Sequence, residues 1–498
     1  MSYQLLEAHF QKVNDLKHIL MFMNWDEATM MPPGGSQVRS CAITTLSGLL
    51  HDMYTDPRLS DWIDSAEAQS GLLNWERINI YEIKRIWREH SCIPTEFHQA
   101  KTKASLECEQ VWRVARDHND WPTILPLLKK VIRFVQEESS LRAQSTGLSP
   151  YDALIDLYEP GMKSSKIEEI GNELKSFLPN LFNRVQEKQS HQVLFPIEGP
   201  FLIEKQRQLC LDMMKAIGFD FHHGRLDSSH HPFCGGVPED ARITTRYSES
   251  NFFDALMATL HETGHALYEQ GLPKTWRHQP VGQSVSTALH ESQALLMEMH
   301  VCRSKEFLNT LLPFLQQTLL GKLTKDPAWQ IDNLYHHLTH VQKGFIRIYA
   351  DEVTYPLHVL LRYELEKALI HGDLLVEDLP NAWNEKMQVL FGLNTQGNFK
   401  EGCLQDVHWM AGIFGYFPTY CLGAITAAQI FAATKRAMPD LLTAISLGDF
   451  TLLRKWLCDH IHSQGSLHTF NELLTKSTGE PLNTKYYFEH LTNRYLRT

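Results

Sequence analysis

Residues 251–271 read NFFDALMATLHETGHALYEQG, and this stretch decides the fold. Asn251 stands where a helix N-cap belongs, Asp254 follows three residues later, and Gly271 supplies a stop signal. Between them the apolar residues recur at spacings of three and four, namely Phe253, Leu256, Met257 and Leu260. The pattern predicts an amphipathic helix over about residues 252–270.

Two histidines, His261 and His265, lie one turn apart on this predicted helix. Side chains four residues apart share a helix face, so both imidazoles can reach one metal ion. Glu262 lies about 100° further round the helix and therefore stands beside such an ion rather than on it. A chain with 26 histidines yields an H-E-x-x-H match by chance about 0.1 times, so the surrounding sequence has to support the interpretation.

The third ligand of such a site has to come from another segment. A metzincin needs glycine at position 268 and histidine at position 271, but this chain has Tyr268 and Gly271, which excludes that class. The alternative is a glutamate on the next helix, for which Glu291 is the main candidate. Glu298, two turns further along, is a weaker candidate and fits an outer acid better. The second helix is predicted from about residue 284 by the apolar residues Leu289, Leu295, Leu296 and Met299.

The set His261, His265 and Glu291 has the composition of a catalytic zinc site with one open position. Zinc with three protein ligands keeps a water in the fourth position and lowers the pKa of that water to about 7. A carboxylate outside the coordination sphere then accepts the proton, and Glu262 fits the role of general base and proton shuttle to the departing amine. These residues predict a metal-dependent peptide hydrolase that uses zinc, with cobalt as the alternative ion.

Further motifs along the chain resemble those of the carboxypeptidase Taq family of zinc metallocarboxypeptidases. They occur in family order and extend the resemblance over essentially the whole chain. Beside the HETGH stretch they are His231-Pro232-Phe233, Asp240-Ala241-Arg242-Ile243-Thr244, His290-Glu291-Ser292-Gln293, Ile346-Arg347-Ile348-Tyr349-Ala350-Asp351 and Gly402-Cys403-Leu404-Gln405-Asp406-Val407-His408-Trp409. The resemblance implies release of single amino acids from the carboxy termini of peptides with broad specificity.

The expected fold is mainly α, with residues 1–498 forming one large helical domain. Amphipathic stretches occur throughout, no linker or internal repeat interrupts them, and 43% of the residues are hydrophobic. Clear examples of such stretches are 3–24, 94–118, 165–188 and 352–370. Short β-like pieces between Gly218 and Tyr247 predict a small antiparallel sheet beside the motif helix. With the resemblance, this indicates a zincin with a deep zinc-containing cleft, similar to neurolysin and angiotensin-converting-enzyme-like peptidases.

An enzyme that works from the carboxy terminus must recognise a free carboxylate, for which a buried arginine is the usual partner. Arg347 matches the family motif, and we expect it on a helix with Asp351 one turn on, either as its orienting partner or in a plain intrahelical pair. Arg242 is the second candidate, although it can instead form a structural ion pair in its segment. The matched positions His231 and Asp240 complete the set of residues that we expect to bind substrate.

The oxyanion of the reaction needs a hydrogen-bond donor besides the metal. Tyr420 and His408 match residues that similar zinc peptidases aim at this oxygen, and the alternative is that they pack in the core with a satisfied polar tip. Gln405, Asp406 and Trp409 are expected to support His408 or the metal ligands from behind.

Composition and charge limit the other classes of function. The net charge of −11 disfavours partners such as nucleic acid and anionic membranes. The start of the chain does not resemble a signal peptide, and no run of 18 apolar residues occurs. Nine cysteines without framework spacing favour free thiols, so we expect a cytoplasmic protein. The resemblance further implies a homodimer.

Two alternatives to a carboxypeptidase stay open. One is a zinc endopeptidase or aminopeptidase of similar fold, in which Arg347 would have no carboxylate to bind. The other is a peptide-binding relative without catalysis, but the intact Glu262 argues against it because such a protein has no need of a base.

Overall fold

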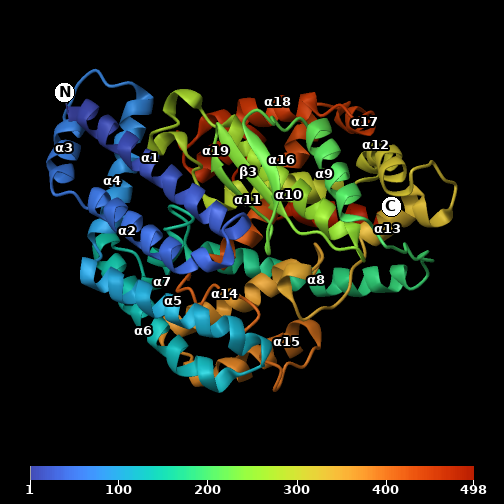
Figure 1. The fold of residues 1–498 in the computed structure, drawn as a ribbon, viewed down its shortest axis with the longest axis horizontal. Coiled ribbons are helices and arrows are strands. Elements are labelled where there is room, and N and C mark those ends of the chain that lie inside the picture. Colours follow the sequence, from blue (N-terminus) through green and yellow to red (C-terminus); the bar gives the residue numbers. More distant parts are fainter. Residues whose placement is uncertain (1, 498) are drawn as a thin grey trace. The chain divides into compact units, whose positions relative to one another are not determined.

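The computed structural model describes residues 2–497, and most of them are helical (Figure 1). The mainly α class is therefore confirmed. The chain groups into two compact units, of which the first contains residues 2–87, 193–339 and 423–486 and the second contains residues 88–192, 340–422 and 487–497. The single domain over residues 1–498, the deep cleft and the likeness to neurolysin-type zincins stay predictions.

The helices of the first unit begin with α1 (Ser2–Thr29), whose N-terminal half packs on α2 and α3. The others are α2 (Ser36–Tyr54), α3 (Arg58–Glu67), α9 (Ile203–Ile217), α10 (Phe252–Gly271), α11 (Thr287–Leu295), α12 (Lys305–Leu315), α13 (Ile331–Leu338), α17 (Leu441–Ser446), α18 (Thr451–His460) and α19 (Phe470–Thr478). The second unit holds α5 (Thr95–Asp117), α6 (Trp121–Thr146), α7 (Pro150–Ile155), α8 (Ser164–Gln189), α14 (Tyr355–His371) and α15 (Leu379–Phe391). Three helices contain residues of both units, namely α4 (Asn74–Ser91), α16 (Phe417–Ala437) and α20 (Lys485–Thr492).

The amphipathic stretches found in the sequence correspond to helices. Stretches 3–24 and 165–188 lie in α1 and α8, stretch 94–118 exceeds α5 by one residue at each end, and stretch 352–370 begins three residues before α14. The motif helix also forms as predicted, because the side chain of Asn251 accepts a hydrogen bond from the backbone N–H of Phe253 and caps α10.

A three-stranded sheet precedes α10 in the first unit and consists of β1 (Gly224–Ser228), β2 (Phe233–Val237) and β3 (Asp240–Thr245). The strand order is β1-β3-β2, and β3 pairs antiparallel with β2 but parallel with β1. The predicted all-antiparallel sheet was therefore wrong. The third strand lies between the two earlier ones, and β1 pairs with it in the parallel direction. The sequence pattern indicates where strands occur, but it does not determine their order or direction in the sheet.

The sheet and the following helices form the frame of the motif. The strand β3 packs on α10 (Figure 1). The hydroxyl of Thr245 donates there to the carbonyl of Ala255. On α10, Gly264 lies so close to α11 that a Cβ there would come within 2.6 Å of the Cα of Ala294. A side chain at this position would push the two helices apart, so this glycine sets how closely α10 and α11 approach.

The helix after α11 has an unusual geometry. Residues Leu296–Cys302 form η4, a π-helix that continues directly from α11. A π-helix closes its hydrogen bonds over five residues, and the N–H of Arg303 accordingly donates to the carbonyl of Glu298. The predicted second helix is therefore present, but its second half is wound differently from an α-helix.

Candidate metal centre and active site

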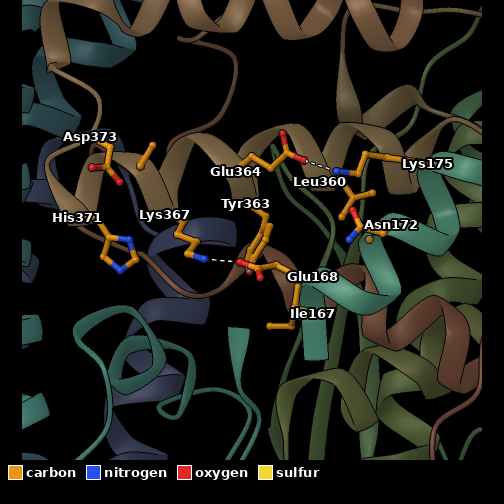
Figure 2. Close-up of a pocket in the computed structure, with 12 residues that line it drawn as sticks. Ile167, Glu168, Asn172, Lys175, Leu360, Tyr363, Glu364, Lys367, His371 and Asp373 are labelled. Carbon is orange, nitrogen blue, oxygen red and sulfur yellow. Dashed lines mark hydrogen bonds and ion pairs between the residues drawn. The ribbon is translucent and has the colours of Figure 1, made fainter. Parts of the chain in front are cut away.

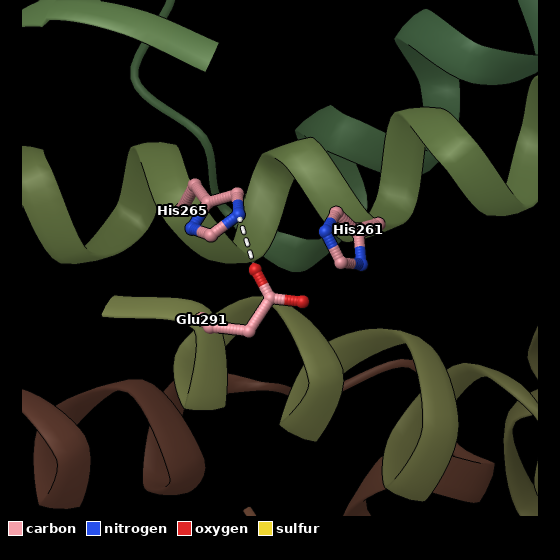
Figure 3. Close-up of side chains that lie close together, drawn as sticks. All are labelled: His261, His265 and Glu291. Carbon is pink, nitrogen blue, oxygen red and sulfur yellow. Dashed lines mark ion pairs between the residues drawn. The ribbon is translucent and has the colours of Figure 1, made fainter. Parts of the chain in front are cut away.

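Three side chains from α10 and α11 converge in the first unit. His261 and His265 project from one face of α10, and Glu291 reaches toward them from α11 (Figure 3). One ligand atom from each of the three lies within 4.8 Å of the others, and the Nε2 of His265 is 3.6 Å from a carboxylate oxygen of Glu291. The three predicted ligands therefore lie together. Among residues 2–497 they form the one group of His, Cys, Asp or Glu side chains with the spacing of a metal site.

The donor chemistry of this cluster fits a divalent ion. Two neutral imidazoles and one carboxylate are ligands that zinc and similar metals accept. Each of the three side chains keeps between 12 and 20% of its surface exposed, so water has access to the site. Burial alone would raise the pKa of Glu291, but the hydrogen bond with His265 and the charge of His261 lower it to about 2. Glu291 is therefore ionised as a ligand has to be.

A second carboxylate orients His261. The Nδ1 of His261 donates to Glu298 at 2.9 Å, and the other oxygen of Glu298 accepts from Arg303 at 2.6 Å. This contact fixes the imidazole so that Nε2 is left for a metal. Burial tends to lower the pKa of His261, but the hydrogen bond to Glu298 and the charges of Glu291 and Glu262 raise it to about 10. Glu298 thus contacts His261 on the side away from Nε2, and its role as an outer acid stays a prediction.

Glu262 lies between the two histidines on α10 and is 7% exposed. Burial and the charge of Glu291 raise the pKa of the Glu262 carboxyl to about 7, although the charge of His261 acts to lower this pKa. A carboxyl with a pKa near neutrality exchanges protons readily at the pH of a cell.

Two further groups surround His265. His290 stacks on its ring at a centroid distance of 4.5 Å and pairs with Glu269 at 2.7 Å. Burial and the neighbouring His290 lower the pKa of His265 to about 4, and its Nδ1 is buried without a hydrogen-bond partner. The imidazole is therefore neutral and presents its Nε2 to the cluster.

Asp240 and Arg242 of β3, and His231 in the bend before β2, also belong to the first unit. Arg242 pairs with both oxygens of Asp240 at 2.8 Å, and its guanidinium lies 4.4 Å over the ring of Trp25. The ion pair considered for this segment is thus present. Whether these side chains contact substrate stays a prediction.

Arg347 lies in the second unit, in the 3-10 helix η7 (Arg347–Tyr349) rather than in an α-helix. The expected pairing with Asp351 was wrong, because Asp351 instead accepts hydrogen bonds from the backbone N–H groups of residues 342, 353 and 354. Arg347 donates from Nε and Nη2 to a single oxygen of Asp406, at 3.2 and 2.9 Å. The partner is 59 residues away in the chain, so a helical spacing argument could not find it.

His408 and Tyr420 contact each other in the second unit. The hydroxyl of Tyr420 lies 3.4 Å from Nε2 of His408, while Nδ1 of His408 is buried without a partner. Burial and the charge of Arg347 lower the pKa of His408 to about 4, so its imidazole is neutral. The polar tip of His408 is therefore only half satisfied, unlike that of an ordinary core histidine.

The expected supports of His408 have other partners. Gln405 accepts from the backbone N–H of Arg347, Asp406 pairs with Arg347 and Arg362, and Trp409 donates to Glu366. None of the three hydrogen-bonds to His408 within the described chain, so that part of the prediction was wrong. Sequence reasoning missed Arg362 and Glu366, although charged residues spaced by four in the apolar run of α14 were a usable signal.

A separate surface cavity of about 330 Å³ lies between α8 and α14 of the second unit (Figure 2). Cross-helix ion pairs line it, with Lys175 2.8 Å from Glu364 and Lys367 beside Glu168. It contains none of the predicted site residues, and both of its lysines are already paired with glutamates.

Comparisons with known proteins agree with the motifs. The model of the carboxypeptidase Taq (M32) metallopeptidase family matches residues 5–495. The chain is 36% identical to thermostable carboxypeptidase 1 of Thermus thermophilus over a 507-residue alignment that covers 99% of this chain and 98% of that protein.

Solved structures are similar over nearly the full length as well. Metallocarboxypeptidase 1 of Trypanosoma cruzi superposes with a TM-score of 0.96 at 43% identity and covers 99% of both chains. The M32 carboxypeptidase of Deinococcus radiodurans has a TM-score of 0.93 at 32% identity and covers 99% of this chain and 98% of its own. None of the helices between residues 2 and 497 has the length and apolar character needed to cross a bilayer.

Proposed function

Because the chain belongs to the carboxypeptidase Taq (M32) metallopeptidase family and is a carboxypeptidase, we propose that it is a zinc enzyme with Glu262 as general base. The observation that carries this proposal is the convergence of His261 and His265 of α10 with Glu291 of α11. Glu262 lies on the same turn of α10 as the two histidines. In our proposal it releases single carboxy-terminal amino acids from peptides with broad specificity.

The three ligands would hold one divalent ion, zinc or alternatively cobalt. When bound, such an ion supplies Lewis acidity, which polarises the scissile carbonyl and lowers the pKa of a water molecule. The chain's own contribution is to keep His265 neutral and Glu291 ionised, while Glu298 orients His261, which would give up its proton when the ion binds.

Glu262 would accept a proton from the attacking water and pass it to the nitrogen of the departing amino acid. Its pKa of about 7 supports both steps, because a group with a pKa near the working pH both accepts and releases a proton at low cost. A more exposed carboxyl with an ordinary pKa would be a weaker base.

Tyr420 and His408 would stabilise the developing negative charge of the reaction. The contact between them supports a joint role, since each orients the other and Nδ1 of His408 has no hydrogen-bond partner. The lowered pKa of His408 makes it a neutral donor at physiological pH.

Arg347 would bind the carboxylate that marks the end of the peptide. Its guanidinium is fixed by Asp406 and lies 4.8 Å over the ring of Tyr420, which supports a rigid recognition group. We propose substrate-binding roles for Arg242, His231 and Asp240 also. At the level of fold, a motif helix beside a small sheet supports a relation to neurolysin-type zincins.

The proposal is tested with an N-blocked dipeptide and its carboxy-terminal amide. A carboxypeptidase hydrolyses the free acid and leaves the amide nearly intact. Comparable rates on both would indicate an endopeptidase, release from an unblocked amino terminus would indicate an aminopeptidase, and binding without turnover would indicate a non-catalytic relative. Elemental analysis of the same preparation identifies the metal, for which we propose about one zinc per chain.

We further propose that the protein acts in the cytoplasm as a homodimer. All nine cysteines are free thiols, which supports a reducing compartment. Light scattering of the purified chain checks the oligomeric state, for which the similarity to the M32 family is the support.

A further inference from the structure

One face of α14 carries a buried stripe of polar residues. His358, Arg362 and Glu366 recur at intervals of four residues, and each is fully buried. Arginine and glutamate are almost never fully buried unless they are paired, so a stripe of this kind requires an explanation.

Arg362 is bound to the same carboxylate that holds Arg347. Its Nε donates to Oδ2 of Asp406 at 2.6 Å, while Arg347 uses Oδ1. Asp406 therefore bridges two guanidinium groups, each through a different oxygen. The aromatic rings of Trp383 and Phe417 pack against the guanidinium of Arg362 at 4.7 and 5.6 Å.

The cluster formed by Arg347, Arg362 and Asp406 carries more positive than negative charge. Two arginines face one aspartate, and no other carboxylate in residues 2–497 forms an ion pair with either guanidinium. The neighbouring His358 does not change this count, because burial and the charge of Arg362 lower its pKa to about 3. The net charge of the cluster is therefore +1.

Two donors of the cluster are left without acceptors. The Nη2 of Arg362 is buried and has no hydrogen-bond partner. Arg347 forms no hydrogen bond from its Nη1 within the described chain and keeps 6% of its surface exposed. An uncompensated buried charge is costly, and a protein keeps one chiefly where a ligand of opposite charge completes the set.

We propose that Arg362 is a positioning residue, which occupies one oxygen of Asp406 so that Asp406 does not fully neutralise Arg347 and a positive charge remains for a substrate carboxylate. This inference rests on the proposed function, in which Arg347 binds the carboxylate of the substrate. Without Arg362, Asp406 is free to pair with Arg347 through both oxygens, and the resulting pair is neutral. With Arg362 in place, the excess positive charge makes a free carboxylate a condition for substrate binding. It therefore selects peptide acids over amides of the same peptide.

The test compares Arg362→Met with the wild type on an N-blocked dipeptide and its amide. We expect KM for the free acid to rise at least about tenfold, with kcat within about threefold and metal content unchanged. Arg362→Lys keeps the charge but loses the planar set of donors, so its KM for the free acid is expected to lie between those of the wild type and Arg362→Met. If Arg362→Met does not fold, Arg362→Gln retains a buried donor without the charge and serves in its place.

Arg494→Met is the matched control, because Arg494 is also buried in the second unit and pairs with Glu352 at 2.5 Å. It should lower thermal stability and leave the preference for acid over amide unchanged. An unchanged KM and preference in Arg362→Met would overturn the inference while the carboxypeptidase assignment stands. A wild type that hydrolyses acid and amide alike would instead remove the proposed function.

Discussion

At the scale of single residues, the roles of the two outer carboxylates separate most clearly. In our proposal Glu262 moves protons, whereas Glu298 is hydrogen-bonded to His261, a proposed metal ligand. Both are acids with little exposed surface near His261, and their partners make them different.

Replacement of Glu262 by glutamine should remove the base and leave the ligands intact. We expect kcat to fall by at least about 10²-fold, because general base catalysis contributes about that much, while bound metal stays near one per chain. Steady-state kinetics and elemental analysis of the same sample check this. Loss of metal from the variant would show that Glu262 is a ligand instead.

The pH dependence of kcat/KM follows from the same residue. The basic form of Glu262 is lost as pH falls through its pKa of about 7, so the rate should fall roughly tenfold per pH unit on the acid side. A bound cation favours the ionised form and moves this midpoint to lower pH. A pH–rate profile measured with metal in excess gives the midpoint, and a rate that rises toward acid pH contradicts the assignment.

Glu291 and Glu298 should differ in their effect on metal binding. Glu291→Ala removes a ligand, and we expect the purified variant to contain no metal. Glu298→Gln removes only the carboxylate behind His261 and should weaken metal affinity by about 10- to 100-fold. Competition with a chelator measures both, and the reverse order of the two affinities would exchange the roles of these residues.

At the scale of elements, the site depends on how closely α10 and α11 pack. Gly264 lies against the backbone of Gln293 and Ala294, and Gly423 of α16 lies against Glu291 from the other side. A Cβ at position 423 would come within 2.8 Å of the Cγ of Glu291. Glu291 is thus held toward the histidines by close helix contacts on both sides of α11.

Gly264→Ala should lower the free energy of unfolding by several kcal/mol, because the added methyl group meets backbone that cannot move away. In an open helix position the same change is expected to stabilise by up to about 1 kcal/mol. Gly48→Ala in α2 is the control, since a Cβ there has nothing within 4 Å. Denaturant titration of both variants tests the difference, and equal effects would mean that the α10–α11 contact is not tight.

Much of the helix α10 could be predicted from the sequence. The cap at Asn251 and the periodic apolar residues gave the bounds of α10 to within one residue, since capping and helix periodicity are local. The strand order β1-β3-β2 and the partner of Arg347 could not be predicted in this way. Both depend on contacts between segments distant in the chain, for which a single sequence holds no local pattern.

At the scale of the whole molecule, buried ionisable groups link stability to pH. Glu366 accepts hydrogen bonds from Trp409, Tyr151 and the backbone of Gly415, and burial nevertheless raises its pKa to about 7. No arginine or lysine pairs with it in residues 2–497, so its neutral form is favoured in the folded state.

A raised pKa in the folded state means that the folded protein binds the proton more tightly than the unfolded chain. The contribution of Glu366 is therefore fully present below about pH 4.5 and is lost as pH rises to about 7, with a limit of about 3 kcal/mol. Denaturant unfolding of wild type and Glu366→Gln between these pH values isolates it. A difference between the two proteins that does not change with pH would show that Glu366 has an ordinary pKa.

The π-helical turn at Leu296–Cys302 has a consequence for how this site tolerates length changes. A π-turn is equivalent to an α-helix with one residue inserted, and that extra residue aligns Arg303 with Glu298. Deletion of Met297 should let the segment rewind as a regular α-helix, in which the residues beyond the turn keep nearly their orientation while Glu298 takes the helix position of the deleted residue, about 100° away. His261 would then lose Glu298 although no contacting residue is replaced, so the chelator assay should give a result like that of Glu298→Gln.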